Sequence, residues 1–135
     1  MKITLHYKSD KEYYTKNDSD NRVEIDMYDP AQKKAQSPME LLLSGLIACA
    51  AVDIAQMVKK RRKTLVDLSG IAEGERREDQ PRKYTSINIH YTITSPDLQQ
   101  EEASRLIHLA VEKYCSVAAS LNDDIKLTHS YEIVK

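Results

Sequence analysis

The chain has 135 residues, a size that suits one domain with one hydrophobic core, so we expect residues 1–135 to form a single domain. Its 20 Lys and Arg residues nearly balance its 21 Asp and Glu residues, and the formal net charge of −1 argues against a nucleic-acid-binding surface or a membrane-attracted one. With 41% hydrophobic and 30% charged residues, the composition is that of a globular protein rather than a disordered one.

The first third of the chain predicts a small antiparallel meander. Residues 1–7 and 23–27 alternate apolar and polar side chains, which is typical of strands, and a short run at 12–15 is expected to pair with the first strand. The segment NDSDN at 17–21 is a dense turn signal. The N-terminus lacks the apolar stretch of a signal peptide, and we expect a cytoplasmic protein.

A long apolar helix is predicted after this meander. Ser37 and Glu40 have the spacing of a capping box, and Pro38 suits the first helical position because its missing N–H costs nothing there. Residues 41–58 are nearly all apolar, and the basic segment KKRRK follows at 59–63. A membrane span is disfavoured because an ionised Asp53 inside hydrocarbon is costly, so we expect a buried central helix.

This helix also predicts an assembly. A helix of about 25 residues extends roughly 37 Å, which exceeds the width of a small domain. The few other elements of one chain cannot cover a helix that is apolar all round. We therefore expect an intertwined homodimer.

The second half of the chain adds strands and a second helix. Residues 65–77 and 84–94 are predicted strands, separated by a charged turn at 75–83. A second helix is expected from about Leu98, and a final strand near the C-terminus. The order β-β-β, long helix, β-β, helix, β predicts an α+β fold with mostly antiparallel sheets.

The chain contains two cysteines, Cys49 and Cys115. Two cysteines make no disulfide framework, and without a nearby pair of histidines they predict no zinc site. Cys49 lies mid-helix among small residues. If the second helix breaks at Tyr114, Ser116 would cap a short helical turn through Leu121 and Cys115 would stand at its N-terminus. Burial raises the pKa of a thiol and a helix N-terminus lowers it, and both outcomes stay open for Cys115.

Several motifs resemble the OsmC/Ohr family, named for osmotic induction and organic-hydroperoxide resistance. The run SPMELLL at 37–43, followed by Cys49, resembles the first cysteine signature of that family. Gly74-Glu75-Arg76, Pro81 and the strand at 84–94 match its middle section. EKYCSV at 112–117 resembles its second cysteine signature. The likeness covers nearly the whole chain.

This resemblance implies an intertwined dimer with two active sites at the subunit interface. By position, Cys49 is the peroxidatic thiolate that attacks a peroxide O–O bond and becomes a sulfenic acid, and Cys115 is the resolving thiol that closes a disulfide. A dithiol reductant, often lipoyl-bearing in the family, then reopens that disulfide. The implied substrate is an organic hydroperoxide, and the implied chemistry uses no metal or organic cofactor.

The sequence departs from the family pattern beside the first cysteine. In the peroxidases of the family, an Arg from the early strands and a Glu directly after the proline hold the thiolate, whereas here Met39 follows Pro38 and Glu40 comes one residue later. A shift of one residue turns a helical side chain by about 100°, so Glu40 is equally well explained as the capping-box carboxylate. Arg22 is the first choice for the arginine, with Arg76 and Arg77 as alternatives.

Two further features bear on the thiol chemistry. Asp53, four residues after Cys49, would oppose a thiolate on the same helix face. The four histidines, His6, His90, His108 and His129, have no local Cys-His motif. Two function classes therefore stay open: a two-cysteine hydroperoxide reductase, and a non-enzymatic thiol protein that binds a small hydrophobic ligand or senses oxidants.

Overall fold

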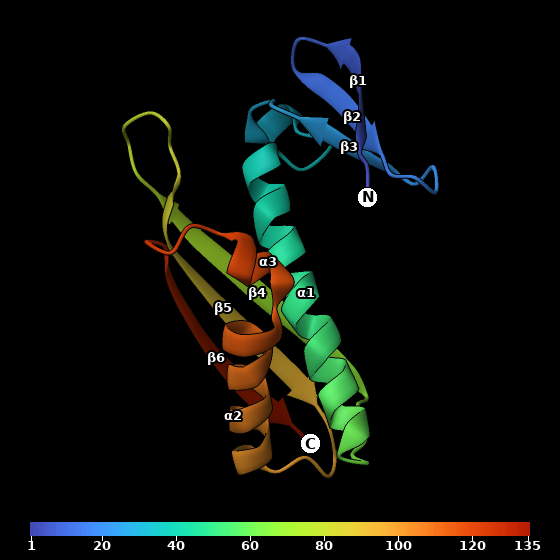
Figure 1. The fold of residues 1–135 in the computed structure, drawn as a ribbon, viewed down its shortest axis with the longest axis vertical. Helices are drawn as coiled ribbons and strands as arrows, with labels where there is room; N and C mark the ends of the chain where they lie inside the picture. Colours follow the sequence, from blue (N-terminus) through green and yellow to red (C-terminus); the bar gives the residue numbers. More distant parts are fainter. The chain divides into compact units, whose positions relative to one another are not determined.

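The computed structural model describes all residues from Met1 to Lys135 and has an α+β fold (Figure 1). Its elements are β1 (Thr4–Ser9), β2 (Glu12–Lys16), β3 (Arg22–Asp26), η1 (Pro30–Gln32), α1 (Pro38–Lys60), β4 (Asp67–Arg76), β5 (Tyr84–Thr94), α2 (Gln100–His108), η2 (Leu109–Tyr114), α3 (Ser116–Ser120) and β6 (Lys126–Val134). The chain divides into two compact units, which we call the N-unit (Met1–Leu42) and the C-unit (Leu43–Lys135). A single domain over residues 1–135 stays a prediction.

The N-unit contains the predicted meander. Strands β1, β2 and β3 pair in sequence order, and both pairings are antiparallel. The predicted turn closes around Asn17, whose side-chain oxygen accepts hydrogen bonds from the backbone N–H groups of Ser19 and Asn21. Asp20 takes a positive φ of 66° there, a conformation that Asp tolerates better than most residues. The turn predicted from the segment NDSDN at 17–21 is therefore confirmed.

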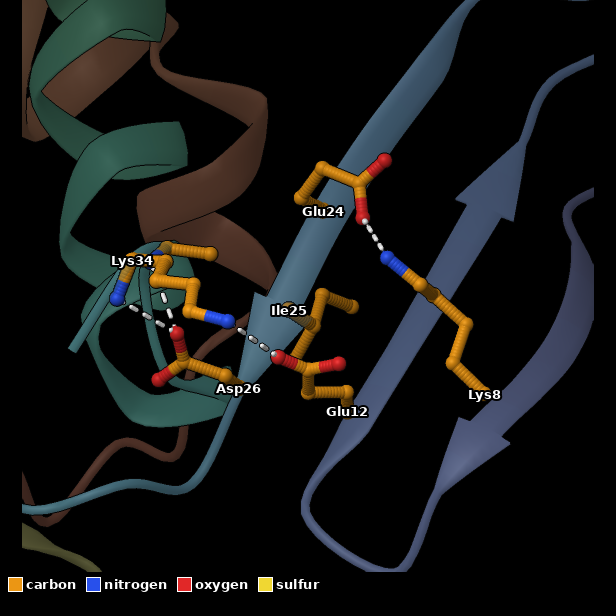
Figure 2. Close-up of a pocket in the computed structure, with 7 residues that line it drawn as sticks. Lys8, Glu12, Glu24, Ile25, Asp26 and Lys34 are labelled. Atoms are coloured by element: carbon orange, nitrogen blue, oxygen red, sulfur yellow. Dashed lines mark hydrogen bonds and ion pairs between the residues drawn. The ribbon is translucent and has the colours of Figure 1, made fainter. Parts of the chain in front are cut away.

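A network of charges, rather than an apolar core, organises the end of β3. Asp26 is the one buried residue of the N-unit. Its carboxylate accepts from Lys33 Nζ at 2.7 Å and from the backbone N–H groups of Lys34 and Ala35, both at 2.8 Å. Figure 2 shows Asp26 beside Lys34, whose Nζ also reaches Glu12 at 3.3 Å. These bonds tie the loop before α1 to β3.

Helix α1 begins as the sequence predicts. Glu40 accepts a hydrogen bond from the Ser37 N–H at 2.9 Å, and Ser37 Oγ accepts one from the Glu40 N–H at 3.2 Å, which completes the capping box. In the C-unit the helix buries one stripe with a spacing of four residues, consisting of Leu46, Ala50, Ile54 and Val58. By length and composition alone α1 could also cross a membrane, which is weak evidence because buried core helices pass the same test.

The C-unit is built on a mixed sheet with β5 at its centre. Strand β4 pairs with β5 in antiparallel fashion, and β6 pairs with β5 in parallel. One face of β5 buries Tyr84, Ile87, Ile89, Tyr91 and Ile93. The predicted alternation of this strand is thus confirmed, and so is the α+β class with mostly antiparallel pairing.

Helices α1 and α2 cover the same face of this sheet. Tyr91 on β5 hydrogen-bonds to α1 through Ile47, and its register partner Tyr131 on β6 hydrogen-bonds to α2 through Gln100. Helix α2 buries Ala103, Leu106 and Ile107. Because both tyrosines point to the helical side, the two helices lie side by side against the sheet (Figure 1).

The second helix breaks where the sequence predicts, but its cap differs. After α2 the chain continues through the π-helical turn η2 and reaches extended geometry at Cys115, whose ψ is 108°. We expected Ser116 to cap the short helix that follows. Instead Cys115 is the N-cap of α3, because its sulfur accepts the Ala118 N–H, and Ser116 is the first helical residue.

Candidate functional site

The fold brings the two cysteines together in the C-unit. Cys49 lies in the middle of α1 and is half-buried, whereas Cys115 at the start of α3 is 3% exposed. The two thiols lie close enough for Cys49 to raise the pKa of Cys115, and both are free. Two cysteines that are distant in the sequence therefore form one thiol pair.

Cys115 is held against α1 by its own backbone surroundings. Its sulfur accepts the Ala118 N–H at 3.3 Å and lies 4.0 Å from the carbonyl oxygen of Leu46, about one helical turn before Cys49. Burial raises the pKa of the Cys115 thiol, the Ala118 N–H opposes that rise, and the neighbouring Cys49 adds to it. Between the two effects that the sequence leaves open, burial outweighs the helix N-terminus, so Cys115 is a neutral thiol at neutral pH.

Tyr91 is a third member of the site that sequence reasoning missed. Its side chain is 1% exposed, and its hydroxyl donates a 2.7 Å hydrogen bond to the Ile47 carbonyl, two residues before Cys49. Burial raises the pKa of the Tyr91 phenol well above its usual range, and the neighbouring Cys115 and Cys49 contribute to the rise. The phenol therefore keeps its proton, which is held in the hydrogen bond to the Ile47 carbonyl beside the thiol pair.

A signal for Tyr91 was present in the sequence. The buried face of β5 is otherwise rich in isoleucine, and a tyrosine in such a row carries a hydroxyl that needs a partner. The alternation alone classified Tyr91 as core, because periodicity does not show what a hydroxyl bonds to.

The predicted thiolate partners Arg22 and Glu40 lie in the N-unit, where each has partners of its own. Arg22 pairs with Glu24, and its guanidinium carbon lies 3.6 Å from the centre of the Tyr14 ring. Glu40 is engaged in the capping box, and its pKa is lowered chiefly by the Ser37 N–H, with further help from the Ser37 hydroxyl and Lys33. Their roles toward Cys49 stay predictions.

The alternative arginines hold the charged turn between β4 and β5. Arg76 donates to the Arg82 carbonyl at 2.7 Å, and Arg77 donates to the Pro81 carbonyl at 2.6 Å.

Asp53 lies one turn after Cys49 on α1, where residues i and i+4 share a face. An effect of the Asp53 carboxylate on the Cys49 thiol stays a prediction.

The histidines lie away from any local cysteine motif. His6 stacks on Tyr14 with ring centres 4.6 Å apart, and His90 shares a hydrogen bond of 2.8 Å with Ser130. His108 and His129, distant in sequence, have ring centres 6.0 Å apart. Tertiary pairing of this kind is not visible in sequence spacing.

Comparison with known proteins identifies the family. A family model described as OsmC-like protein matches residues 31–130, which include both cysteine signatures. Protein YhfA of Escherichia coli K12 is 43% identical over 101 residues, which cover 75% of each chain. The chain belongs to the OsmC-like family, as its two cysteine signatures indicated.

Solved structures share the fold over almost the full length. A hypothetical protein from Aquifex aeolicus is 28% identical with a TM-score of 0.85, and the match covers 98% of this chain and 94% of that one. An OsmC-like protein from Mycoplasma pneumoniae is 22% identical with a TM-score of 0.87, over 99% and 96% of the two chains. An organic hydroperoxide resistance protein OsmC from Legionella pneumophila is 17% identical with a TM-score of 0.73, over 98% and 97%, and at that identity it shows the fold alone.

Proposed function

We propose that this protein is a thiol peroxidase that reduces organic hydroperoxides with Cys49 and Cys115. The observation that carries the proposal is the pair of free thiols that the fold brings together, Cys49 on α1 and Cys115 at the N-cap of α3. The raised pKa of Cys115 supports an asymmetric pair, in which a neutral Cys115 is the poorer nucleophile and Cys49 attacks. The name of the Legionella relative is consistent with this substrate class.

The proposed cycle has three steps. The Cys49 thiolate attacks the outer oxygen of ROOH, the O–O bond breaks, and the alkoxide leaves as ROH after it takes up a proton, so that Cys49 becomes a sulfenic acid. The Cys115 thiol then attacks the Cys49 sulfur, which forms an intrachain disulfide and releases water. A dithiol reductant, for which a lipoyl-bearing protein is our candidate, exchanges with that disulfide and restores both thiols. A reducing cytoplasm is the compartment that this cycle fits.

Arg22 supplies the cation and Glu40 the orienting carboxylate in this proposal. Arginine is always charged at neutral pH, and a cation beside a thiolate favours its ionised form. The test compares Arg22→Gln with Arg76→Gln and Arg77→Gln, which remove the same charge from the β4–β5 turn. We expect a slower reaction with hydroperoxide for Arg22→Gln only. Reaction rates equal to that of the parent protein in all three variants would remove arginine assistance from the proposal.

The decisive experiment measures how much cumene hydroperoxide the reduced protein consumes. We expect one equivalent per chain, followed by loss of both free thiols and a Cys49–Cys115 crosslink in peptide maps. Cys49→Ser should consume none, and Cys115→Ser should react once and accumulate a sulfenic acid. A reaction no faster than that of free cysteine, with both thiols intact, would overturn the peroxidase proposal.

The second candidate is a thiol protein that binds a hydrophobic molecule or senses oxidants without turnover. It is favoured by Met39 at the position of the family Glu and by the prior engagement of Glu40 in the capping box. This candidate predicts a disulfide that forms once but is not reopened at a catalytic rate by dihydrolipoamide. Multiple turnovers with that reductant would exclude it.

We also propose that two chains assemble as an intertwined dimer, as members of the family usually do. Support comes from large apolar side chains that a single chain leaves exposed, such as Leu5 at 66%, Val52 at 56% and Ile71 at 59%. Burying them stabilises the assembly at roughly 25 cal/mol per Å² of apolar surface. Sedimentation should give twice the 15.4 kDa mass of one chain. A folded monomer at micromolar concentration would contradict the dimer.

A further inference from the structure

A cluster of nitrogen and oxygen ligands lies in the C-unit, outside the thiol pair. His108 is the last residue of α2, Glu112 lies in η2, and His129 lies on β6. Each offers one ligand atom, and all of these atoms lie within 4.8 Å of one another. The peroxidase cycle uses none of them.

The distances within this cluster suit a small divalent ion. His108 Nδ1 lies 2.9 Å from one carboxylate oxygen of Glu112, and His129 Nε2 lies 3.8 Å from the other. Zinc bonds of about 2.0–2.1 Å in tetrahedral geometry place neighbouring ligand atoms about 3.3 Å apart. The two separations, which run to the two oxygens of one carboxylate, lie on either side of that value, and no pair of ligand atoms is more than 4.8 Å apart.

All three ligands lie on helices or strands and are accessible to solvent. The His129 side chain is 21% exposed, against 60% for His108 and 47% for Glu112. The histidines also line an open surface groove, whose other lining residues are Arg61, Glu101, Glu102, Ser104 and Arg105. Its two arginines and two glutamates balance, so the groove carries no net charge that repels a cation. It therefore offers an entry path from solvent.

We propose that His108, Glu112 and His129 form a site for a divalent transition-metal ion, with Zn²⁺ as the best match. Two imidazoles and one carboxylate are a ligand set that zinc accepts, and solvent completes the fourth position. A bound ion would cross-link η2 to β6. Glu112 lies three residues before Cys115, so the ion would also anchor the segment that carries the second thiol.

The test must separate this site from the thiols, which also bind zinc. Titration calorimetry with Zn²⁺ alone is run on a tag-free chain carrying Cys49→Ser and Cys115→Ser. We expect one ion per chain, and a loss of affinity of about tenfold or more in His108→Gln and in Glu112→Gln, because even outer-sphere changes at metal sites cost about 10–100-fold. The matched control is His90→Gln, a half-exposed histidine bonded to Ser130 on β6, which should bind as the parent does.

A second readout uses the unaltered protein and needs no cysteine substitution. Co²⁺ bound by nitrogen and oxygen ligands should give visible absorption without a thiolate-to-cobalt charge-transfer band, and His108→Gln should abolish that absorption. Binding that is unchanged in His108→Gln and Glu112→Gln would overturn the site. So would visible cobalt absorption that His108→Gln leaves unchanged, or the absence of stoichiometric Zn²⁺ binding in the cysteine-free chain.

Discussion

The two units of this chain are stabilised in different ways. The C-unit buries a full set of apolar side chains between its sheet and the two helices. The N-unit buries one residue, Asp26, and leaves Ile3, Leu5, Tyr7 and Val23 exposed. A small three-stranded sheet needs an apolar face packed against something else. The difference teaches that the C-unit has an apolar core of its own, although Val52 and Ile71 stay exposed on it, whereas the N-unit has strand structure but no apolar core.

The largest expected effect lies in the C-unit core. Ile89 is fully buried at the centre of β5, so Ile89→Ala should lower the free energy of unfolding by about 2–5 kcal/mol. Denaturant titration followed by circular dichroism measures this loss. A loss below about 1 kcal/mol would mean that the contrast between the two units is smaller than their burial indicates.

The next prediction tests what covers the N-unit. Leu5→Asp places a charge on an apolar side chain of β1 that the dimer proposal buries, so sedimentation velocity should show a shift from dimer to monomer. Thr4→Asp is the matched control, because successive strand residues point to opposite faces. Equal behaviour of the two variants would show that β1 does not face the partner chain.

Acid should weaken the N-unit through its buried carboxylate. Burial opposes the ionisation of Asp26, but the hydrogen bonds from Lys33 and from the backbone of Lys34, Ala35 and Tyr28 outweigh it and lower the pKa to about 2 from 3.8. Because the folded-state pKa is the lower one, this stabilisation is complete above pH 3.8 and disappears as the pH falls toward 2.

Asp26→Asn isolates that contribution. It should be less stable than the parent at pH 7, and its stability should change less between pH 4 and pH 2, as measured by thermal unfolding at each pH. Glu24, Glu40 and Asp97 also have lowered pKa values, but both proteins contain these residues. They therefore do not account for a difference between the two pH profiles. Parallel pH profiles for the two proteins would show that Asp26 is not the group responsible.

The smallest expected effect is on the hydrogen bond beside the thiol pair. Tyr91→Phe and Tyr131→Phe each remove a hydroxyl that donates to a helix carbonyl, so each should cost about 0.5–1.5 kcal/mol of unfolding free energy. Only Tyr91 lies beside the cysteines, so only Tyr91→Phe should change the rate at which iodoacetamide alkylates them. The same alkylation rate in both variants would remove Tyr91 from the site.

Local signals in the sequence predicted most of the fold. The alternation of β5, the turn at Asn17 and the capping box of Ser37 and Glu40 were each predicted from short patterns and confirmed. The exception was the cap of α3, where a thiol took the place expected of the Ser116 hydroxyl. N-cap preferences favour Ser, Thr, Asp and Asn and do not include Cys, so they predict Ser116 rather than Cys115 as the cap.

The site was less predictable, because it depends on contacts between distant segments. The resemblance to a known family pointed to Cys49 and Cys115, and no spacing rule would have paired residues so far apart. Tyr91 and the cluster of His108, Glu112 and His129 were missed for the same reason. The parallel pairing of β6 with β5 places His129 beside α2, and a local pattern carries no information about that pairing.

The position of Tyr91 has a practical consequence for spectroscopy. The chain has no tryptophan, so its ultraviolet emission comes from eight tyrosines alone. Among them Tyr91 is the one enclosed beside both sulfur atoms, where its phenol stays protonated. A change in the charge or bonding of those sulfurs alters the field at this ring. We therefore expect oxidation of the thiols to change the emission of this ring, which comparing the tyrosine fluorescence of the reduced and oxidised protein would test.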